Sequence, residues 1–382
     1  MGINAILPGQ VLANDASVGD VLTAQADGSS AFQSPAGGGI GGSTGSTDNA
    51  AIRADGTGGS TLQSADWIMP DNYTASPNAT VNVCALEATG ATTNVGVAIV
   101  PQGAGAFSLH VPDDTTAGGN ARGTNAVDLQ TLRSAANQVA SGPGAFAAGR
   151  NCQSSGWDAV AIGRAATATG FGAVAIGGGS ATEGSAISIG YNSTSTSSFS
   201  VALGAFAYAT NVYSFAGPLA KSTGAYATAF GGSSDADRYG MRAFAAGYFT
   251  YGQAGEAQSV GFTLRNKTTG ATATELFLDG SSTRLTIPNG KILHATVHVL
   301  GSKSDGSAIA IYQRQVAIAN VSGTTSLVGS VNTIGSDTAA STSFSITADD
   351  TNDALKIEVT GIAAETWRWV ASVSGAELAY GT

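Results

Sequence analysis

Glycine recurs along the middle of this chain with a nearly constant period. One series of glycines is spaced 13 to 16 residues apart, and short alternating apolar runs such as AVAIG, AISIG and SVALG end at several of its members. The series comprises Gly149, Gly163, Gly177, Gly190, Gly204, Gly217, Gly231 and Gly247. A unit this short cannot bury a hydrophobic face alone, so it must stack on its neighbours. The repeat therefore predicts a rod of stacked coils over 142–249.

Each coil is expected to contain two short strands, because a second set of markers, mostly glycine, falls midway between the first. In the first strand Val, Ile or Leu alternates with Ala, and alternate side chains of a strand lie on opposite faces. We expect the larger side chains to fill the coil interior. The alanines, such as Ala161, Ala175 and Ala202, are then expected to face a neighbouring chain. The second strand is rich in Thr and Ser and is expected to face solvent.

Self-association follows from the size of the coil. A repeat of about 14 residues has a core only two side chains wide, so one chain buries little apolar surface. We expect contacts between chains to supply the missing burial, and we favour a threefold rod.

Residues 125–141 differ from the repeat. Their apolar residues are spaced three, four and three apart, as in the seam of a coiled coil. Asn125 is a candidate helix N-cap. The spacing predicts a short helical neck between chains, and the alternative is a helix packed on a globular domain. The expected interface residues are Leu129, Leu132, Ala136 and Val139.

The flanking regions show strand patterns. Residues 1–75 alternate with turns, and 76–124 read as a small β domain. Residues 250–382 contain alternating strands without a helical pattern, which predicts an antiparallel β-sandwich. The fold class is therefore mainly β: an N-terminal β region, a helical neck, a stack of coils and a C-terminal sandwich.

The composition limits the classes of partner that this chain is expected to bind. The 382 residues carry a net charge of −10, and only 11% of them are charged. An acidic chain with few Lys and Arg is a poor ligand for nucleic acid or for an anionic membrane surface. We find neither a signal peptide nor an apolar run that would span a membrane, so no membrane insertion is expected. Cys84 and Cys152 are expected to be free thiols.

The repeat, with its signature xAVAIGxxAxAxG, resembles the head of trimeric autotransporter adhesins. That resemblance implies a left-handed parallel β-roll with three chains around one axis. The flanks resemble tail fibre proteins of bacterial viruses, in STDNAAIRADGTGGSTLQSAD, GGNARGTNAVDLQTLRSAANQVASG and DDTNDALKIEVTGIAAETWRWVASV. This second resemblance implies an elongated homotrimeric fibre on the outside of the virion. Residues 1–75 would attach to other tail or baseplate proteins, and 250–382 would contact a host-surface glycan or protein, or cap the rod.

Few side chains in the sequence suggest a catalytic or ligand-binding site. The rod contains only four carboxylates, whereas glycan-cleaving spikes need a facing pair. We place Asp235, Asp237 and Arg238 in a protruding turn of the last and longest interval, as candidate receptor contacts. Trp367 and Trp369 share one face of a strand, where they form either a sugar-stacking platform or part of the sandwich core.

The two histidines of KILHATVHVL, His294 and His298, would lie too far apart on one strand to bind a single metal ion. The sequence thus predicts no catalytic residue, cofactor or metal, and a chain that is not an enzyme. Two alternatives stay open. One is a tailspike-like enzyme that degrades a surface glycan with Asp235 and Asp237, and the other is a fragment of a bacterial trimeric adhesin.

Overall fold

The computed structural model describes residues 98–380 and the backbone of six short strands between residues 21 and 87. The chain forms two units, 1–100 and 101–382. The first contains three antiparallel pairs: β1 (Val21–Ala24) with β2 (Ser30–Gln33), β3 (Ile52–Ala54) with β4 (Leu62–Ser64), and β5 (Met69–Tyr73) with β6 (Val83–Glu87). The predicted virion-attachment region, 1–75, otherwise lies outside the described residues, as do residues 76–82 and 88–97 of the predicted small β domain.

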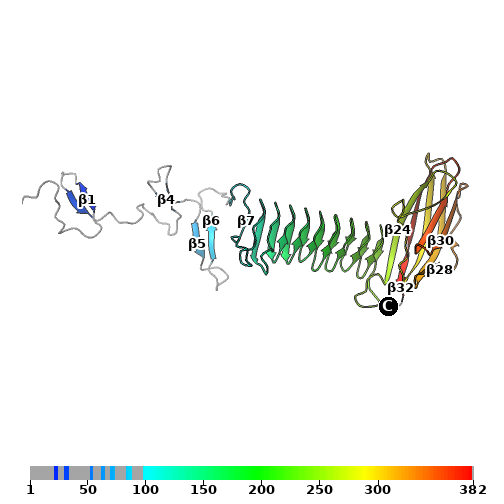
Figure 1. The fold of residues 1–382 in the computed structure, drawn as a ribbon, viewed down its shortest axis with the longest axis horizontal. Coiled ribbons are helices and arrows are strands. Elements are labelled where there is room, and N and C mark those ends of the chain that lie inside the picture. The colour runs from blue at the N-terminus through cyan, green and yellow to red at the C-terminus, as the bar shows by residue number, and fades with distance from the viewer. Residues whose placement is uncertain are drawn as a thin grey trace, which may run out of the picture. The chain divides into compact units, whose positions relative to one another are not determined.

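The second unit begins with a parallel β-solenoid (Figure 1). One strand of every coil joins a 16-stranded sheet, here called the long sheet. Its solenoid strands are β7 (Phe107–Ser108), β8 (Val127–Leu132), β9 (Phe146–Arg150), β11 (Val160–Arg164), β13 (Val174–Ile176), β15 (Ile187–Ile189), β17 (Val201–Leu203), β19 (Phe215–Ala216), β21 (Thr228–Phe230) and β23 (Arg242–Phe244).

The other strand of each coil joins a seven-stranded sheet, here called the short sheet. It contains β10 (Gln153–Ser154), β12 (Thr167–Ala168), β14 (Ser180–Ala181), β16 (Thr194–Ser195), β18 (Tyr208–Ala209), β20 (Lys221–Ser222) and β22 (Asp235–Ala236). Equivalent residues of successive coils pair in register, for example Val160 with Val174. The predicted stack of coils is therefore present. Glycine permits the close stacking, because a Cβ on Gly156 would collide with the carbonyl oxygen of Gly170 in the next coil.

The coil interior consists of small side chains, which reverses the predicted assignment of faces. Ala161, Ala175 and Ala202 are fully buried inside their own chain. The apolar part of the core of the first coils consists of alanines and Cys152, and Ser154 and Ser188 are buried in the same interior. Because the corners between the two sheets are short, small side chains fill nearly all of the interior. The Val, Ile and Leu residues of the same strands point outward instead, and they are partly exposed.

The predicted helical neck is wrong. Val127–Leu132 is strand β8, which pairs in parallel with β9. Its inward-facing residues are Asp128 and Gln130, both fully buried, and Leu132 is half exposed. Asp128 accepts hydrogen bonds from Arg122 at 2.8 Å and from Arg133 at 3.0 Å. These ion pairs neutralise the buried carboxylate at the first turns of the solenoid, so Asp128 can face inward on a strand of the stack. Among the residues that the structure describes there is no helix, and hence none that could cross a membrane.

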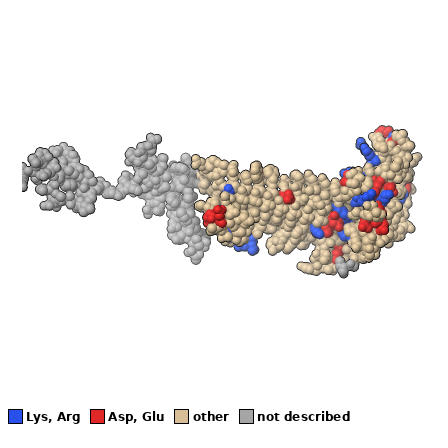
Figure 2. All heavy atoms as spheres, in the orientation of Figure 1, with Lys and Arg blue, Asp and Glu red and all other residues tan. Residues whose placement is uncertain are grey.

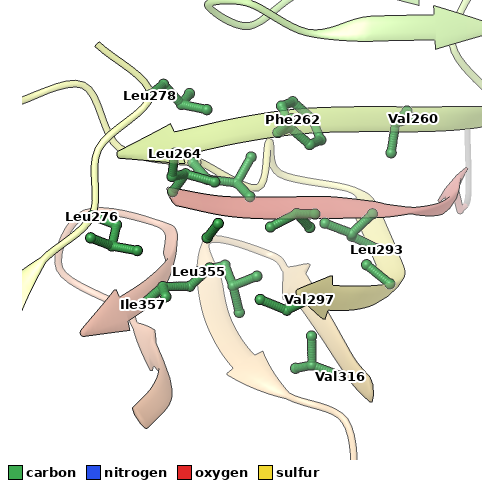
Figure 3. Packing of buried hydrophobic residues seen from close by; sticks show 14 of the residues in the cluster. Val260, Phe262, Leu264, Leu276, Leu278, Leu293, Val297, Val316, Leu355 and Ile357 are labelled. Carbon is green, nitrogen blue, oxygen red and sulfur yellow. The ribbon is translucent and has the colours of Figure 1, made fainter. Parts of the chain in front are cut away.

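Residues 257–379 are antiparallel and extend the long sheet, because β24 pairs with β23 of the last coil. This part contains β24 (Ala257–Thr268), β26 (Lys291–Lys303), β27 (Ile309–Val321), β28 (Thr324–Leu327), β29 (Asn332–Thr333) and β32 (Trp367–Ala379). A separate three-stranded sheet consists of β25 (Ala273–Glu275), β30 (Ser343–Asp349) and β31 (Ala354–Thr360). Side chains of both sheets, such as Phe262, Val297 and Ile357, converge in one hydrophobic core (Figure 3).

We expect Asp128→Ala to destabilise the full chain by about 3–5 kcal/mol, because it leaves Arg122 and Arg133 buried without their carboxylate. Urea unfolding followed by circular dichroism measures the loss. Asp305→Ala, which removes an exposed carboxylate, should leave the stability nearly unchanged. Equal losses for the two variants would contradict the buried role of Asp128.

Candidate functional site

Charged side chains gather where the last coil of the solenoid meets the C-terminal antiparallel domain (Figure 2). The solenoid supplies Asp235 in β22, followed directly by Asp237 and Arg238. The C-terminal domain supplies Lys291 at the start of β26 and Glu377 near the end of β32. We call this set, together with Gln258 of β24 and Lys221 of β20, the junction cluster.

Arg238 is the centre of the junction cluster. Its guanidinium is almost fully buried, lies 4.9 Å from the centre of the Phe262 ring, and donates to Asp237 at 2.8 Å and to Glu377. Lys291 bridges the same two carboxylates, at 3.2 Å from Asp237 and 3.0 Å from Glu377. Two cations thus alternate with two carboxylates, and buried charges require such pairing.

Asp235 lies at the edge of this network. Its backbone is held by the side-chain amide of Gln258 through two hydrogen bonds of 2.9 Å. One carboxylate oxygen lies 3.5 Å from the ammonium of Lys221, and the other is buried without a hydrogen-bond partner. Burial raises the pKa of Asp235 and the negative charge of Asp237 adds to the shift, while Lys221 opposes it.

Asp237 titrates in the opposite direction. Burial alone would raise its pKa, but the positive charges of Arg238 and Lys291 outweigh burial and lower the pKa below the ordinary value of 3.8. Two neighbouring carboxyl groups with opposite pKa shifts are the arrangement in which one group holds a proton while the other stays ionised. The junction cluster therefore holds two carboxyl groups whose pKa values are shifted in opposite directions.

The structure brings the predicted residues Asp235, Asp237 and Arg238 together, but not in a protruding turn. β22 pairs with β20 in the regular solenoid register, and β23 continues it from β21, so the interval holds no protruding loop. The two extra residues of the glycine spacing lie after β23. Arg238 is buried, which removes it as a surface contact.

Trp367 and Trp369 belong to the core of the C-terminal domain and not to a receptor-contact surface. Both are buried, their rings stack with centroids 5.6 Å apart, and their indole nitrogens donate to Glu365 and Thr268. His294 and His298 lie on the exposed face of β26. Across residues 98–380, no three His, Cys, Asp or Glu side chains are grouped to hold a metal ion.

Sequence reasoning missed Gln258, Lys291 and Glu377, which reach the site from distant strands. The burial of Glu377 could have been predicted from the sequence. In WRWVASVSGAELA it has the same parity as Trp367, Trp369 and Val373, so it lies on the buried face of β32. A carboxylate on an otherwise apolar face predicts a buried cationic partner.

Comparisons with known proteins give weak likenesses. No protein-family model matches the chain, and no curated protein matches it. One similar solved structure is the tailspike protein gp49 of Acinetobacter baumannii bacteriophage Fri1, a capsular polysaccharide depolymerase, with 10% identity and a TM-score of 0.21. Another is the tailspike protein of Acinetobacter phage vB_ApiP_P1, with 11% identity and a TM-score of 0.16. Each match covers 62% of this chain, but only 42% of the first protein and 51% of the second.

The expectation that this chain is not an enzyme is contradicted by the first of these findings, because the Fri1 tailspike is a depolymerase, and we withdraw it.

The junction cluster predicts opposite effects for two matched substitutions. Asp237→Asn should lower the free energy of unfolding at pH 7 by about 1.5–3 kcal/mol, because it removes charge-assisted hydrogen bonds. The stabilisation from Asp237 is present above its unfolded pKa, near 3.8, and is lost as the pH falls through the lower folded pKa. Asp235→Asn should preserve or raise the free energy of unfolding at pH 7. Because the folded pKa of Asp235 is raised, ionising this group destabilises the folded chain, and the destabilisation develops as the pH rises from 3.8 through the folded pKa.

Urea unfolding of both variants between pH 3 and pH 8 tests this pair. A destabilisation of Asp235→Asn at pH 7 as large as that of Asp237→Asn would contradict the assignment of the two pKa shifts.

Proposed function

We propose that this chain is part of a homotrimeric tail protein of a bacterial virus that attaches the particle to a polysaccharide of the host surface. The observation that carries the proposal is the outward face of the long sheet, which suits a rod of three chains. The sequence resemblance to tail fibres at both flanks of the solenoid supports the viral assignment. Attachment of residues 1–75 to other tail or baseplate proteins remains part of the proposal.

The outward face of the long sheet consists of two apolar columns that run along the solenoid. The members of both columns are partly buried or exposed, although most of them are large. The columns contain Phe146, Val160, Val174, Ile187, Val201 and Phe215 in one row, and Ile162, Ile176, Ile189, Leu203, Phe230 and Phe244 in the other. A contiguous apolar face of this kind marks an interaction surface. The alanine interior buries little apolar area, so covering these columns adds stabilisation that one chain lacks.

The opposite face of the solenoid differs in chemistry. Its outward residues in the short sheet are mostly Thr and Ser, such as Thr169, Thr182 and Thr194. A hydroxyl-rich face is well solvated and has no need of a protein partner. In the proposed trimer the long sheets of three copies therefore face one axis, and the short sheets face outward.

Polysaccharide cleavage is the second candidate function, and Asp235 and Asp237 favour it. Asp235 is the first residue of β22 and Asp237 follows that strand directly, so their backbones are roughly 6–7 Å apart at most. Paired carboxylates of glycoside hydrolases are separated by about 5–9.5 Å, with one of them protonated. In that role Asp235, whose pKa is raised, would be the proton donor, and Asp237, whose pKa is lowered, would be the ionised carboxylate beside it.

The proposed trimer predicts different consequences for a charge on the outward face of the long sheet and a charge on the outward face of the short sheet. Ile176→Glu places a carboxylate in the proposed interface and should convert the full chain to monomers, since burial of an unpaired charge is costly. Thr182→Glu, on the outward face of the short sheet, should leave the trimer intact. Sedimentation velocity distinguishes the two, and a trimer that survives Ile176→Glu would contradict the assigned interface.

Binding and cleavage are tested together with surface polysaccharides purified from a panel of bacterial strains. We expect saturable binding of the full chain to the polysaccharide of its host and no binding to cells from which that polysaccharide has been removed. Release of new reducing ends that stops in Asp235→Asn would establish the cleavage function. The full chain could instead bind whole cells of a strain but none of the polysaccharides purified from that strain. That result would overturn the proposed ligand class.

A further inference from the structure

The two corners of each solenoid coil differ in charge. We call the turn before a strand of the long sheet the leading corner, and the turn after it the trailing corner. From 142 to 232 the chain has only five charged residues. The two carboxylates, Asp158 and Glu183, lie at leading corners, before β11 and β15, and two of the cations, Arg150 and Arg164, lie at the start of trailing corners, as the last residues of β9 and β11. The fifth, Lys221, lies in the short sheet beside Asp235.

These four corner charges are exposed and unsatisfied within one chain. None of them forms an ion pair with another of the described residues. Arg150 and Arg164 are direct neighbours in the register of β9 and β11. Like charges directly opposite on adjacent strands repel each other. A carboxylate from outside the chain would relieve that repulsion.

Bulky apolar side chains occupy both corners of the later coils. Phe199, Tyr213 and Tyr226 lie at leading corners and stack on one another, with ring centroids 5.1 and 5.0 Å apart. Phe206 and Leu219 lie at trailing corners. All five are exposed, and all have φ between 54° and 59°. Large side chains rarely adopt this left-handed conformation. Their presence there, where the other coils have Gly, Ala, Ser, Asn or Asp, points to a contact surface.

Rotational symmetry determines which corners meet. The strands of the long sheet run across the solenoid, so in a ring of copies they follow one another head to tail. The trailing corner of one copy then lies beside the leading corner of the next, at the same level, which is a heterologous contact. In three of the coils the two corners are complementary. The coil of β11 has Asp158 and Arg164, the coil of β17 has Phe199 and Phe206, and the coil of β19 has Tyr213 and Leu219.

We propose that copies of this chain join edge to edge through these corners, and that Arg164 of one copy forms an ion pair with Asp158 of its neighbour. This inference rests on the proposed trimer. It adds a contact that aligns equivalent coils of neighbouring copies at the same height along the axis. The aromatic residues of the later coils form the apolar part of the same edge.

A charge swap in the full chain tests the pairing. Arg164→Asp and Asp158→Arg should each raise the dissociation constant of the trimer about tenfold or more, because each places like charges together. The double swap should restore the constant to within about threefold of the wild type. Sedimentation velocity over a dilution series in urea, an uncharged denaturant, provides the constants. Asp305→Arg, a reversal far from the corners, should change nothing.

The outcomes separate this inference from the proposed function. A wild-type chain that is monomeric would overturn the trimer itself. A trimer that is unaffected by the single reversals, or one that the double swap fails to restore, would overturn the ion pair while the trimer stands. In 1 M NaCl the single variants should approach the wild type, since the Debye length falls to about 3 Å.

Discussion

The narrow interior of the coils governs the rest of this structure. Short corners hold the two strands of a coil close together, and alanine, serine and one cysteine fill the space between them. Larger apolar side chains of the long sheet consequently lie outside, where one chain cannot bury them. The same geometry that makes the solenoid regular thus leaves it with an apolar face, and that face is the physical reason for proposing an assembly.

Buried charge lies near both ends of the solenoid. Asp128, Arg122 and Arg133 occupy the first turns, and Arg238, Lys291 and Glu377 join the last coil to the C-terminal domain. A parallel solenoid exposes unpaired strand edges at its ends, and such edges invite uncontrolled pairing with other chains. At the C-terminal end β24 pairs with β23 and covers that edge directly, while the junction cluster fixes its orientation.

The sequence predicted the stack of coils, the two strands per coil and the antiparallel character of the C-terminal part, because period and alternation report strands directly. It did not reveal which face is inside. Alternation identifies two faces, and the choice between them depends on the distance between the sheets. The helical neck failed for a related reason: the spacing of Leu129, Leu132 and Val139 fits a helix, while the buried Asp128 and Gln130 look like surface residues. In the candidate site, Asp235 and Asp237 were identified, but their partners Lys291 and Glu377 come from strands far away in the sequence.

The most direct test of the account is the absolute mass of the purified full chain in solution by light scattering. The account predicts a mass about three times the 37.6 kDa of one chain, because three apolar faces cover one another around an axis. A stable monomer with an intact β-sheet spectrum would contradict it, since the outward columns of the long sheet would then remain in contact with water.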